Sequence, residues 1–318
     1  MKFSDKYDVV VIGGGPAGSI AARTTVEKGL KTLLLEKDRD FGVPVRCGEG
    51  ISLPGMKNFI EPNPKWVDNY LARVRFIAPD GTVLPINLIE TGCVLNRKVF
   101  DFELARRAAE AGAEVRNRCC ATGLEYNANG ITVKFEHGDE LFSVKSQVVI
   151  GADGVESRVG RWAGLDTSLP LADVETCYQV TLYYKSIEIE YCDFYFGNTI
   201  APGGYIWLFP KGKNCANVGI GIAGDRAKDK SPESYLEDFI EKRFPGSSIL
   251  SSMAGSVPSR HILKKMVTDR VLIAGDAAHQ ANPLTGGGIL SGMWGGRLAA
   301  ETAVEAFESG DFSAAFLY

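Results

Sequence analysis

A glycine-rich turn near the N-terminus constrains the fold of this chain more than any other feature. The apolar run Tyr7–Ile12 predicts a buried strand, and it leads directly into a GxGxxG turn at residues 13–18. A stretch with helical spacing follows, and the segment Leu30–Glu36, with its apolar centre Leu33–Leu35, then predicts a second buried, parallel strand. This order of strand, glycine turn, helix and strand is that of the dinucleotide-binding unit of doubly wound α/β folds.

Each position of the turn has a physical role in binding a pyrophosphate. Gly13 permits the tight turn, Gly15 lets the backbone approach the phosphates, and Gly18 lets the helix pack close to the sheet. The helix N-terminus adds free N–H groups and a partial positive charge. Glu36 ends the second strand and can accept hydrogen bonds from a ribose diol. The turn alone does not distinguish FAD from NAD, and a glycine turn without a ligand is the alternative.

A second glycine-rich turn, in the sequence VLIAGDAAHQANPLTGGGI, favours FAD. The predicted strand Val271–Ala274 delivers Asp276, whose carboxylate can accept a hydrogen bond from a polyol hydroxyl. The run Gly286–Gly288 then brings bare backbone N–H groups to the start of a helix. Such a turn suits the N1–C2=O edge of a flavin, because reduced flavin carries negative charge there. We therefore expect residues 13–18 and 276–289 to converge on one FAD.

The middle of the chain has a different pattern. From about Asp166 to Gly224, alternating or aromatic-rich runs are separated by Gly and Pro, which is typical of an antiparallel sheet. Helical spacing is found in Val99–Gly112 and Ser231–Phe244. The pattern predicts a discontinuous FAD-binding domain over residues 1–70, 95–165 and 265–318, and a substrate-binding sheet domain over 71–94 and 166–264. A further helical part is expected beyond Tyr318.

Composition narrows the classes of partner and environment. The 318 residues are 45% hydrophobic and 23% charged, and the net charge of −4 argues against general attraction to nucleic acid. No apolar stretch reaches the roughly 18 residues that a membrane-spanning helix needs. Seven cysteines without a signal peptide indicate a reducing cytoplasm. No CxxC pair of the metal-binding type is present, so no metal site is predicted.

The order of three motifs resembles the para-hydroxybenzoate hydroxylase-like flavoproteins: GxGxxG at the N-terminus, GADG at Gly151–Gly154, and Gly275-Asp276. Other segments narrow the resemblance to the geranylgeranyl reductase family, and within it to the archaeal digeranylgeranylglycerophospholipid reductases. These segments are Pro44–Gly50 (PVRCGEG), Pro202–Pro210 (PGGYIWLFP, similar to the family's PxxYxWxFP) and Ala216–Gly221. The resemblance implies an α/β fold in which a Rossmann-type FAD-binding domain carries an inserted antiparallel β-sheet domain for the substrate.

The resemblance also implies roles for individual residues. Ala17 would lie at the pyrophosphate turn, Glu36 at the adenosine ribose, and Ala121 would contact the adenine through its main chain. Asp276 would hold the ribityl chain. The residues that would lie along the flavin are Cys47, Gly48, Gly50, Arg97, Gly288 and Ile289. Ordinary structural roles are the alternatives: Arg97 as a surface helix residue, Ala121 as strand packing, and Asp153 of the GADG segment as a support for its own turn.

Tyr205, Trp207 and Phe209 alternate along one predicted strand and therefore share a face. In the family that this chain resembles, the face borders the substrate cavity, and core packing is the alternative. Cys47 is a candidate proton donor, because an ordinary thiol, with a pKa near ~8.5, is protonated at neutral pH. It could instead be a packing residue or a redox-active thiol. For His279 a structural or supporting role is expected.

The function implied by the resemblance is FAD-dependent reduction of isolated C=C bonds in geranylgeranyl chains, the prenyl chains of membrane-lipid precursors. A hydride from flavin N5 would reach the more substituted carbon, and a proton the less substituted one. Two alternatives stay open: an FAD-dependent aromatic monooxygenase, and a non-catalytic carrier of flavin or lipid. The implied partners are a prenyl lipid and an electron donor such as NADPH or ferredoxin. The implied location is the cytoplasm, with peripheral membrane contact.

Overall fold

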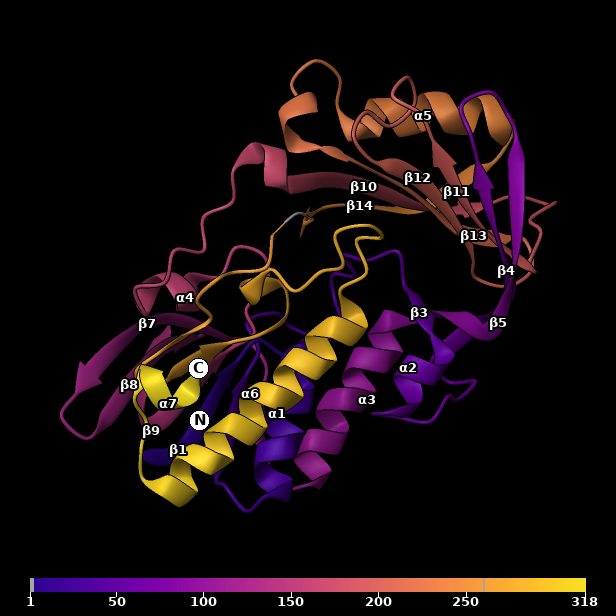
Figure 1. Cartoon of the computed structure of the whole chain (residues 1–318). Helices are drawn as coiled ribbons and strands as arrows, with labels where there is room; N and C mark the ends of the chain where they lie inside the picture. Colours follow the sequence, from indigo (N-terminus) through magenta and orange to yellow (C-terminus); the bar gives the residue numbers. More distant parts are fainter. Residues whose placement is uncertain (1–2, 260) are drawn as a thin grey trace. The chain divides into compact units, whose positions relative to one another are not determined.

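The computed structural model describes residues 3–259 and 261–318, with the side chains of residues 88–91 left out. The chain divides into two compact units (Figure 1). The first unit comprises Met1–Pro44, Lys98–Ser168 and His261–Tyr318, and the second comprises Val45–Arg97 and Leu169–Arg260. The division expected from the sequence placed residues 45–70 with the first unit. They belong to the second, because strands from this segment pair there with residues 83–95.

The first unit is built on a mainly parallel sheet. Its strands follow the order β15-β16-β9-β1-β2-β6. Their bounds are β1 Lys6–Ile12, β2 Thr32–Leu35, β6 Glu114–Arg116, β9 Glu140–Gly151, β15 Val267–Thr268 and β16 Val271–Ile273. Strands β6, β2, β1, β9 and β16 all run parallel, so their carboxyl ends meet at one edge of the sheet. Ligands of doubly wound folds bind at this edge.

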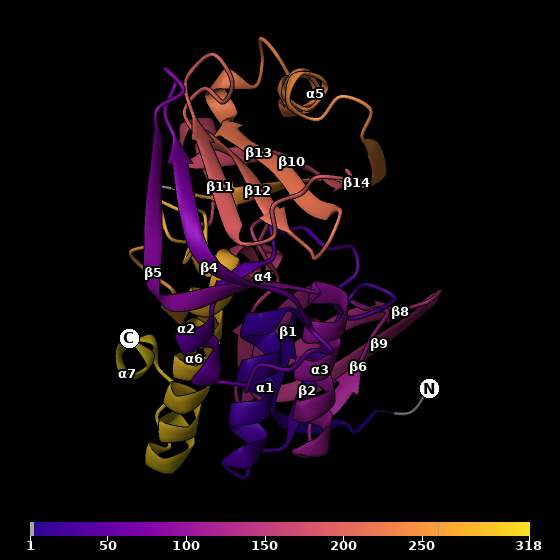
Figure 2. The same ribbon diagram turned by 90° about the vertical axis from the view of Figure 1, so that its right-hand side faces the viewer.

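Helices cover one face of this sheet, and an antiparallel layer covers the other. Helices α1 (Pro16–Glu27), α3 (Arg97–Glu110) and α6 (Ile289–Ser309) lie side by side in both views (Figures 1 and 2). Small side chains such as Ala21, Ala108 and Ala300 form the core beneath them, joined by Leu317 of α7 (Ala314–Leu317). The opposite face packs against β7 (Cys119–Asn127), β8 (Gly130–His137) and α4 (Arg158–Trp162).

The second unit is built on a mainly antiparallel sheet with the order β14-β10-β13-β12-β11-β4-β5-β3. The bounds are β3 Gly50–Ser52, β4 Val67–Ile77, β5 Val83–Leu95, β10 Val174–Tyr183, β11 Tyr191–Phe196, β12 Tyr205–Pro210, β13 Cys215–Ala223 and β14 Ser248–Pro258. Strands β11 and β4 pair in parallel. The short helix α2 (Leu53–Lys57) follows β3.

Helix α5 (Pro232–Arg243) covers one face of the second sheet. Its Leu236 and Ile240 pack with Val218 and Ile220 of β13 and with Ile206 of β12. Because side chains alternate along a strand, the residues between these project from the other face. We call this other face, with Tyr205, Trp207 and Phe209 on β12, Asn217, Gly219 and Gly221 on β13, and Gln179 on β10, the site face.

Most of the predicted elements are confirmed. The second strand, the first helix and the helix capped by Ser231 are present, and the Ser231 hydroxyl accepts a hydrogen bond from the Ser234 N–H at 3.1 Å. The segment that follows α3 does not form one continuous strand. It is broken between β6 and β7, where Arg118 takes a left-handed conformation with φ +53°. As a result β6 joins the parallel sheet, whereas β7 begins a hairpin with β8.

Among the described residues, no helix is both long enough and apolar enough to cross a membrane.

Candidate functional site

The glycine turn of the first unit leaves open space where a pyrophosphate is expected. Side chains at Gly13 or Gly18 would collide with backbone: a Cβ at Gly13 would lie 2.2 Å from the Ala152 oxygen, and one at Gly18 would lie 1.9 Å from the Gly13 oxygen. Among the residues that the structure describes, a Cβ at Gly15, in contrast, would meet no atom within 4 Å. Gly15 is also the N-cap of α1, and no described side chain caps that helix. Uncapped N–H groups beside open space fit the phosphates of FAD.

Glu36 braces the same turn. Its Oε2 accepts a hydrogen bond from the Gly14 N–H at 2.6 Å, and its Oε1 accepts one from the Asp38 N–H at 2.8 Å. Carboxylate oxygens have further lone pairs, so both can still accept from a ribose diol. The predicted ribose contact stays a prediction, and the structure adds that Glu36 fixes the backbone of the turn.

The C-terminal turn lies against the N-terminal one. A Cβ at Gly275 would lie 3.0 Å from the Ala17 Cβ, and a Cβ at Gly296 in α6 would lie 2.1 Å from the Ala17 oxygen. This close packing of α6 on α1 is visible in Figures 1 and 2. A Cβ at Gly288, just before α6, would lie 2.9 Å from Oδ1 of Asp276. The two distant segments thus converge at the carboxyl edge of the parallel sheet, as expected.

The first unit also holds three other residues considered from the sequence: Ala121, Ile289 and Asp153. Ala121 is buried in β7 at a register shift, and Ile289 is the buried first residue of α6. Asp153 accepts hydrogen bonds from the Ser157 hydroxyl at 3.1 Å and the Val159 N–H at 2.9 Å. Burial nevertheless raises the pKa of its carboxyl. These contacts hold the turn before α4 and support a structural role for Asp153.

His279 is almost fully buried and takes a left-handed conformation with φ +55°. Its Nε2 makes no hydrogen bond to any residue that the structure describes. Burial lowers the pKa of the imidazole, so the neutral form is favoured. The supporting role of this histidine stays a prediction.

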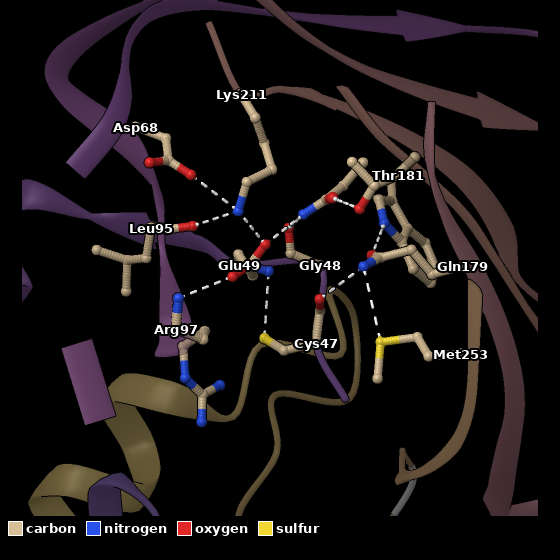
Figure 3. Close-up of polar contacts among 12 residues, drawn as sticks. Cys47, Gly48, Glu49, Asp68, Leu95, Arg97, Gln179, Thr181, Lys211 and Met253 are labelled. Atoms are coloured by element: carbon tan, nitrogen blue, oxygen red, sulfur yellow. Dashed lines mark hydrogen bonds and ion pairs between the residues drawn. The ribbon is translucent and has the colours of Figure 1, made fainter. Parts of the chain in front are cut away.

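In the second unit, the segment Cys47–Gly50, which we call the CGEG loop, is held by a buried polar network (Figure 3). Glu49 is 4% exposed, and its Oε1 accepts a hydrogen bond from the Arg97 N–H at 2.8 Å. Its Oε2 accepts from Asn217 Nδ2 at 2.6 Å and forms an ion pair with Lys211. Lys211 also donates to the Leu95 oxygen and pairs with Asp68, each at 2.9 Å.

The aromatic residues of β12 support the same loop. A Cβ at either Gly48 or Gly50 would lie 3.0 Å from the ring of Phe209, and one at Gly48 would lie 3.2 Å from Trp207 Nε1. Gln179 donates from Nε2 to the Cys47 oxygen at 3.0 Å and accepts at Oε1 from Trp207 Nε1 at 2.9 Å. The CGEG loop thus packs directly on the site face.

The Cys47 thiol lies in a setting that favours its protonated form. Burial raises the thiol pKa, and this effect outweighs the neighbouring Arg97, which lowers it. Sγ accepts a hydrogen bond from the Glu49 N–H at 3.2 Å. Tyr205, on the same face, has its phenol pKa raised by burial and then by Glu175. Both groups therefore carry their protons at neutral pH, and either could donate one.

The predicted site residues fall into two groups. The first unit holds Gly13, Gly15, Ala17, Gly18, Glu36, Ala121, Asp276, Gly288 and Ile289. The second holds Cys47, Gly48, Gly50, Arg97, Tyr205, Trp207 and Phe209. The flavin contacts of the second group stay predictions.

Four polar residues of the network that holds the CGEG loop were not predicted as site residues: Glu49, Gln179, Lys211 and Asn217. One available signal was the single acidic residue between Gly48 and Gly50, and another was Asn217 within an apolar strand.

Comparison with known proteins shows extensive similarity. The model of the geranylgeranyl reductase catalytic domain matches residues 173–257, and that of the FAD-dependent oxidoreductases matches residues 8–190. A digeranylgeranylglycerophospholipid reductase of Methanocella arvoryzae is 46% identical over 316 residues, covering 97% of this chain and 80% of the relative. One from Methanosarcina mazei is 48% identical over 316 residues, covering 97% and 78%.

Solved structures show the same similarity. A geranylgeranyl bacteriochlorophyll reductase-like protein of Thermoplasma acidophilum matches with a TM-score of 0.94 and 37% identity, covering 98% of this chain and 81% of that one. A flavin-dependent brominase matches with a TM-score of 0.78 at 19% identity, covering 98% and 82% of the two chains, and shares the fold.

Proposed function

Because the chain belongs to the geranylgeranyl reductase family of FAD-dependent oxidoreductases, we propose that it reduces isolated C=C bonds in the geranylgeranyl chains of membrane-lipid precursors. The observation that carries this proposal is the packing of the CGEG loop on the site face. The loop joins a protonated thiol to an aromatic surface within one unit. Both elements lie in segments that distinguish this family from other flavoproteins with the same fold.

The residues on this face suit addition of hydrogen to an unpolarised alkene. Bound FAD, when reduced, supplies a hydride, and the protein must supply a proton and exclude water. Cys47 is proposed to donate the proton to the less substituted carbon, and its thiolate then regains a proton from solvent. The partly buried rings of Tyr205 and Phe209 would stabilise the positive charge that develops at the more substituted carbon. The aromatic lining would also keep the reacting bond dry.

We further propose that the substrate is a phospholipid precursor bearing prenyl chains, as the names of the relatives suggest. Such a lipid resides in a bilayer, so the protein would contact the membrane peripherally from the cytoplasm. The electrons would come from NADPH, ferredoxin or another donor of low potential.

Anaerobic incubation of dithionite-reduced protein with a geranylgeranyl lipid tests the proposal. Mass spectrometry should show a gain of about two mass units for each double bond reduced, and the flavin absorbance should return as lipid is consumed. Flavin that stays reduced with every prenyl lipid tried would contradict it. Consumption of NADH that depends on an aromatic substrate would instead indicate a monooxygenase.

A further inference from the structure

We propose that Glu49 is a positioning residue: its buried carboxylate fixes the CGEG loop on the site face and thereby fixes the orientation of the Cys47 thiol. The inference rests on the proposed function only where it links the thiol to prenyl reduction. The contacts and their effect on the thiol can be tested separately.

The loop has little means of holding its own shape. Glu49 adopts a left-handed conformation with φ +72°, which costs a residue with a side chain about 1 kcal/mol or more. Gly48 and Gly50 flank it and add conformational freedom. The ordered loop therefore depends on contacts made from outside it.

The Glu49 side chain provides three of those contacts. Its two carboxylate oxygens accept from donors on separate segments: the Arg97 N–H after β5, Lys211 after β12, and Asn217 within β13. Lys211 is only 15% exposed and supplies the cation that a buried carboxylate requires. Removing the carboxylate charge would leave these donors without their shared acceptor.

The backbone of Glu49 contacts the Cys47 side chain directly. The Glu49 N–H donates to Cys47 Sγ at 3.2 Å, so the backbone that the carboxylate holds also orients the thiol. Gln179 holds the other side of Cys47 through its carbonyl oxygen at 3.0 Å. Glu49 also acts by charge, because a nearby anion raises the pKa of the thiol.

The test is Glu49→Gln in the full chain loaded with FAD. The amide keeps the shape of the side chain, but its NH2 group would face other donors, and the negative charge is gone. Burial is the largest effect that raises the thiol pKa, so release of the loop, which exposes the thiol, lowers that pKa even though the Glu49 N–H contact, which lowers it, is lost as well. Loss of the negative charge lowers the thiol pKa too. We expect alkylation of Cys47 by iodoacetamide at pH 7 to become several times faster, because the variant holds a larger fraction of its thiol as the reactive thiolate. Peptide mass spectrometry separates Cys47 from the other cysteines, and the rate is measured across pH.

Asp68→Asn is the matched control. Asp68 and Glu49 pair with the same nitrogen, Lys211 Nζ. The variant therefore removes one carboxylate from this lysine and leaves every contact of Glu49 in place. Alkylation of Cys47 should stay within about twofold of the wild-type rate. If Asp68→Asn raises the rate as much as Glu49→Gln, general loss of charge balance is responsible, and the inference is overturned.

A second variant covers the case in which Glu49→Gln does not fold. Asn217→Ser removes the amide that donates to Glu49 at 2.6 Å and to the Gly48 oxygen at 3.3 Å, and it keeps the ion pair. The alkylation rate should therefore rise in the same direction by a smaller factor. A wild-type pH profile of Cys47 alkylation in folded Glu49→Gln would mean that Glu49 does not position the thiol. If Glu49→Gln does not fold, the same profile in Asn217→Ser would mean the same. A lower melting temperature with that unchanged profile would mean a purely structural role.

The same experiment separates this inference from the proposed function. Alkylation reports on Cys47 whether or not a prenyl lipid is reduced. A shifted profile in a protein that reduces no prenyl chain would reject the proposed reaction and leave the positioning contacts established. An unshifted profile in a protein that does reduce prenyl chains would reject the role of Glu49 alone.

Discussion

Trp207 donates a 2.9 Å hydrogen bond from its indole Nε1 to Oε1 of Gln179, although strand β13 lies between the strands that carry them. The indole crosses the position of Gly219, where a Cβ would lie 2.2 Å from Trp207 Cζ2. Gln179 in turn holds the Cys47 oxygen. Trp207 is 8% exposed, so this contact gives it a packing role, whether or not it also borders the substrate.

Gly219→Ala should therefore destabilise the second unit. The new methyl group would displace the indole and break its hydrogen bond to Gln179, and overpacking of this kind costs about 1–3 kcal/mol. Urea denaturation followed by tryptophan fluorescence measures the loss. The control is Gly123→Ala in β7, where a Cβ would meet no atom within 4 Å. Equal stability of the two variants would show that the indole does not depend on the glycine.

Gly15→Ala should weaken FAD binding without harming the fold. The backbone at Gly15 is extended (φ −69°, ψ −175°), which alanine adopts freely, and the methyl group would meet no protein atom within 4 Å. Loss of the N-cap glycine costs at most about 1 kcal/mol. The methyl group would, however, occupy the space expected for the pyrophosphate. Losing even one hydrogen bond to a charged phosphate costs about 1.5–3 kcal/mol, so a titration by flavin fluorescence should show affinity at least tenfold lower.

Gly18→Ala provides the contrast for that prediction. Its Cβ would lie 1.9 Å from the Gly13 oxygen, so the helix and the turn could not both keep their places. We expect this variant to be insoluble or poorly folded, with no FAD bound. Wild-type FAD affinity in Gly15→Ala would place the pyrophosphate elsewhere.

The features that the sequence predicts well are those encoded over short distances. The turn at residues 13–18, helix α1 and the capping of α5 by Ser231 each depend on neighbours within a few positions. The unbroken apolar run Val9–Ile12 in β1 also predicts burial on both faces, which the structure shows for Val9, Val10 and Val11.

The features that the sequence could not predict depend on pairing between distant residues. Glu49 meets Asn217 across 168 positions and Lys211 across 162, and neither residue type nor spacing indicates such a pair. The division of the chain near Val45 could not be predicted for the same reason, since it is set by the pairing of β3 with β5. The exposed, serine-rich strand β14 lacks the apolar alternation that would have indicated it.

His279 should make the protein less stable in acid. Burial lowers the pKa of the folded imidazole below its ordinary value of 6.5. The unfolded chain therefore binds more protons as the pH falls below about 6.5, so the free energy of unfolding falls until the lowered pKa is passed. His279→Asn, which tolerates the left-handed backbone, should lose less stability between pH 7.5 and pH 5 in chemical denaturation. An equal loss in both proteins would assign the acid sensitivity to other groups.

Cys47→Ala should retain FAD but lose prenyl reduction. If the thiol donates the proton, its removal should slow the reaction by about 10²–10⁴-fold, the usual contribution of a general acid. Because the protonated thiol is the active form, the wild-type rate should stay level through neutral pH and decline only as the pH rises through the thiol pKa, which burial raises. Single-turnover oxidation of reduced flavin by a geranylgeranyl lipid measures both effects.

The control for loss of a thiol is Cys120→Ala, which replaces a partly exposed cysteine of β7. If Cys47→Ala keeps the wild-type rate and the alkaline decline, the proton comes from another group, and Tyr205 on the same face becomes the next candidate.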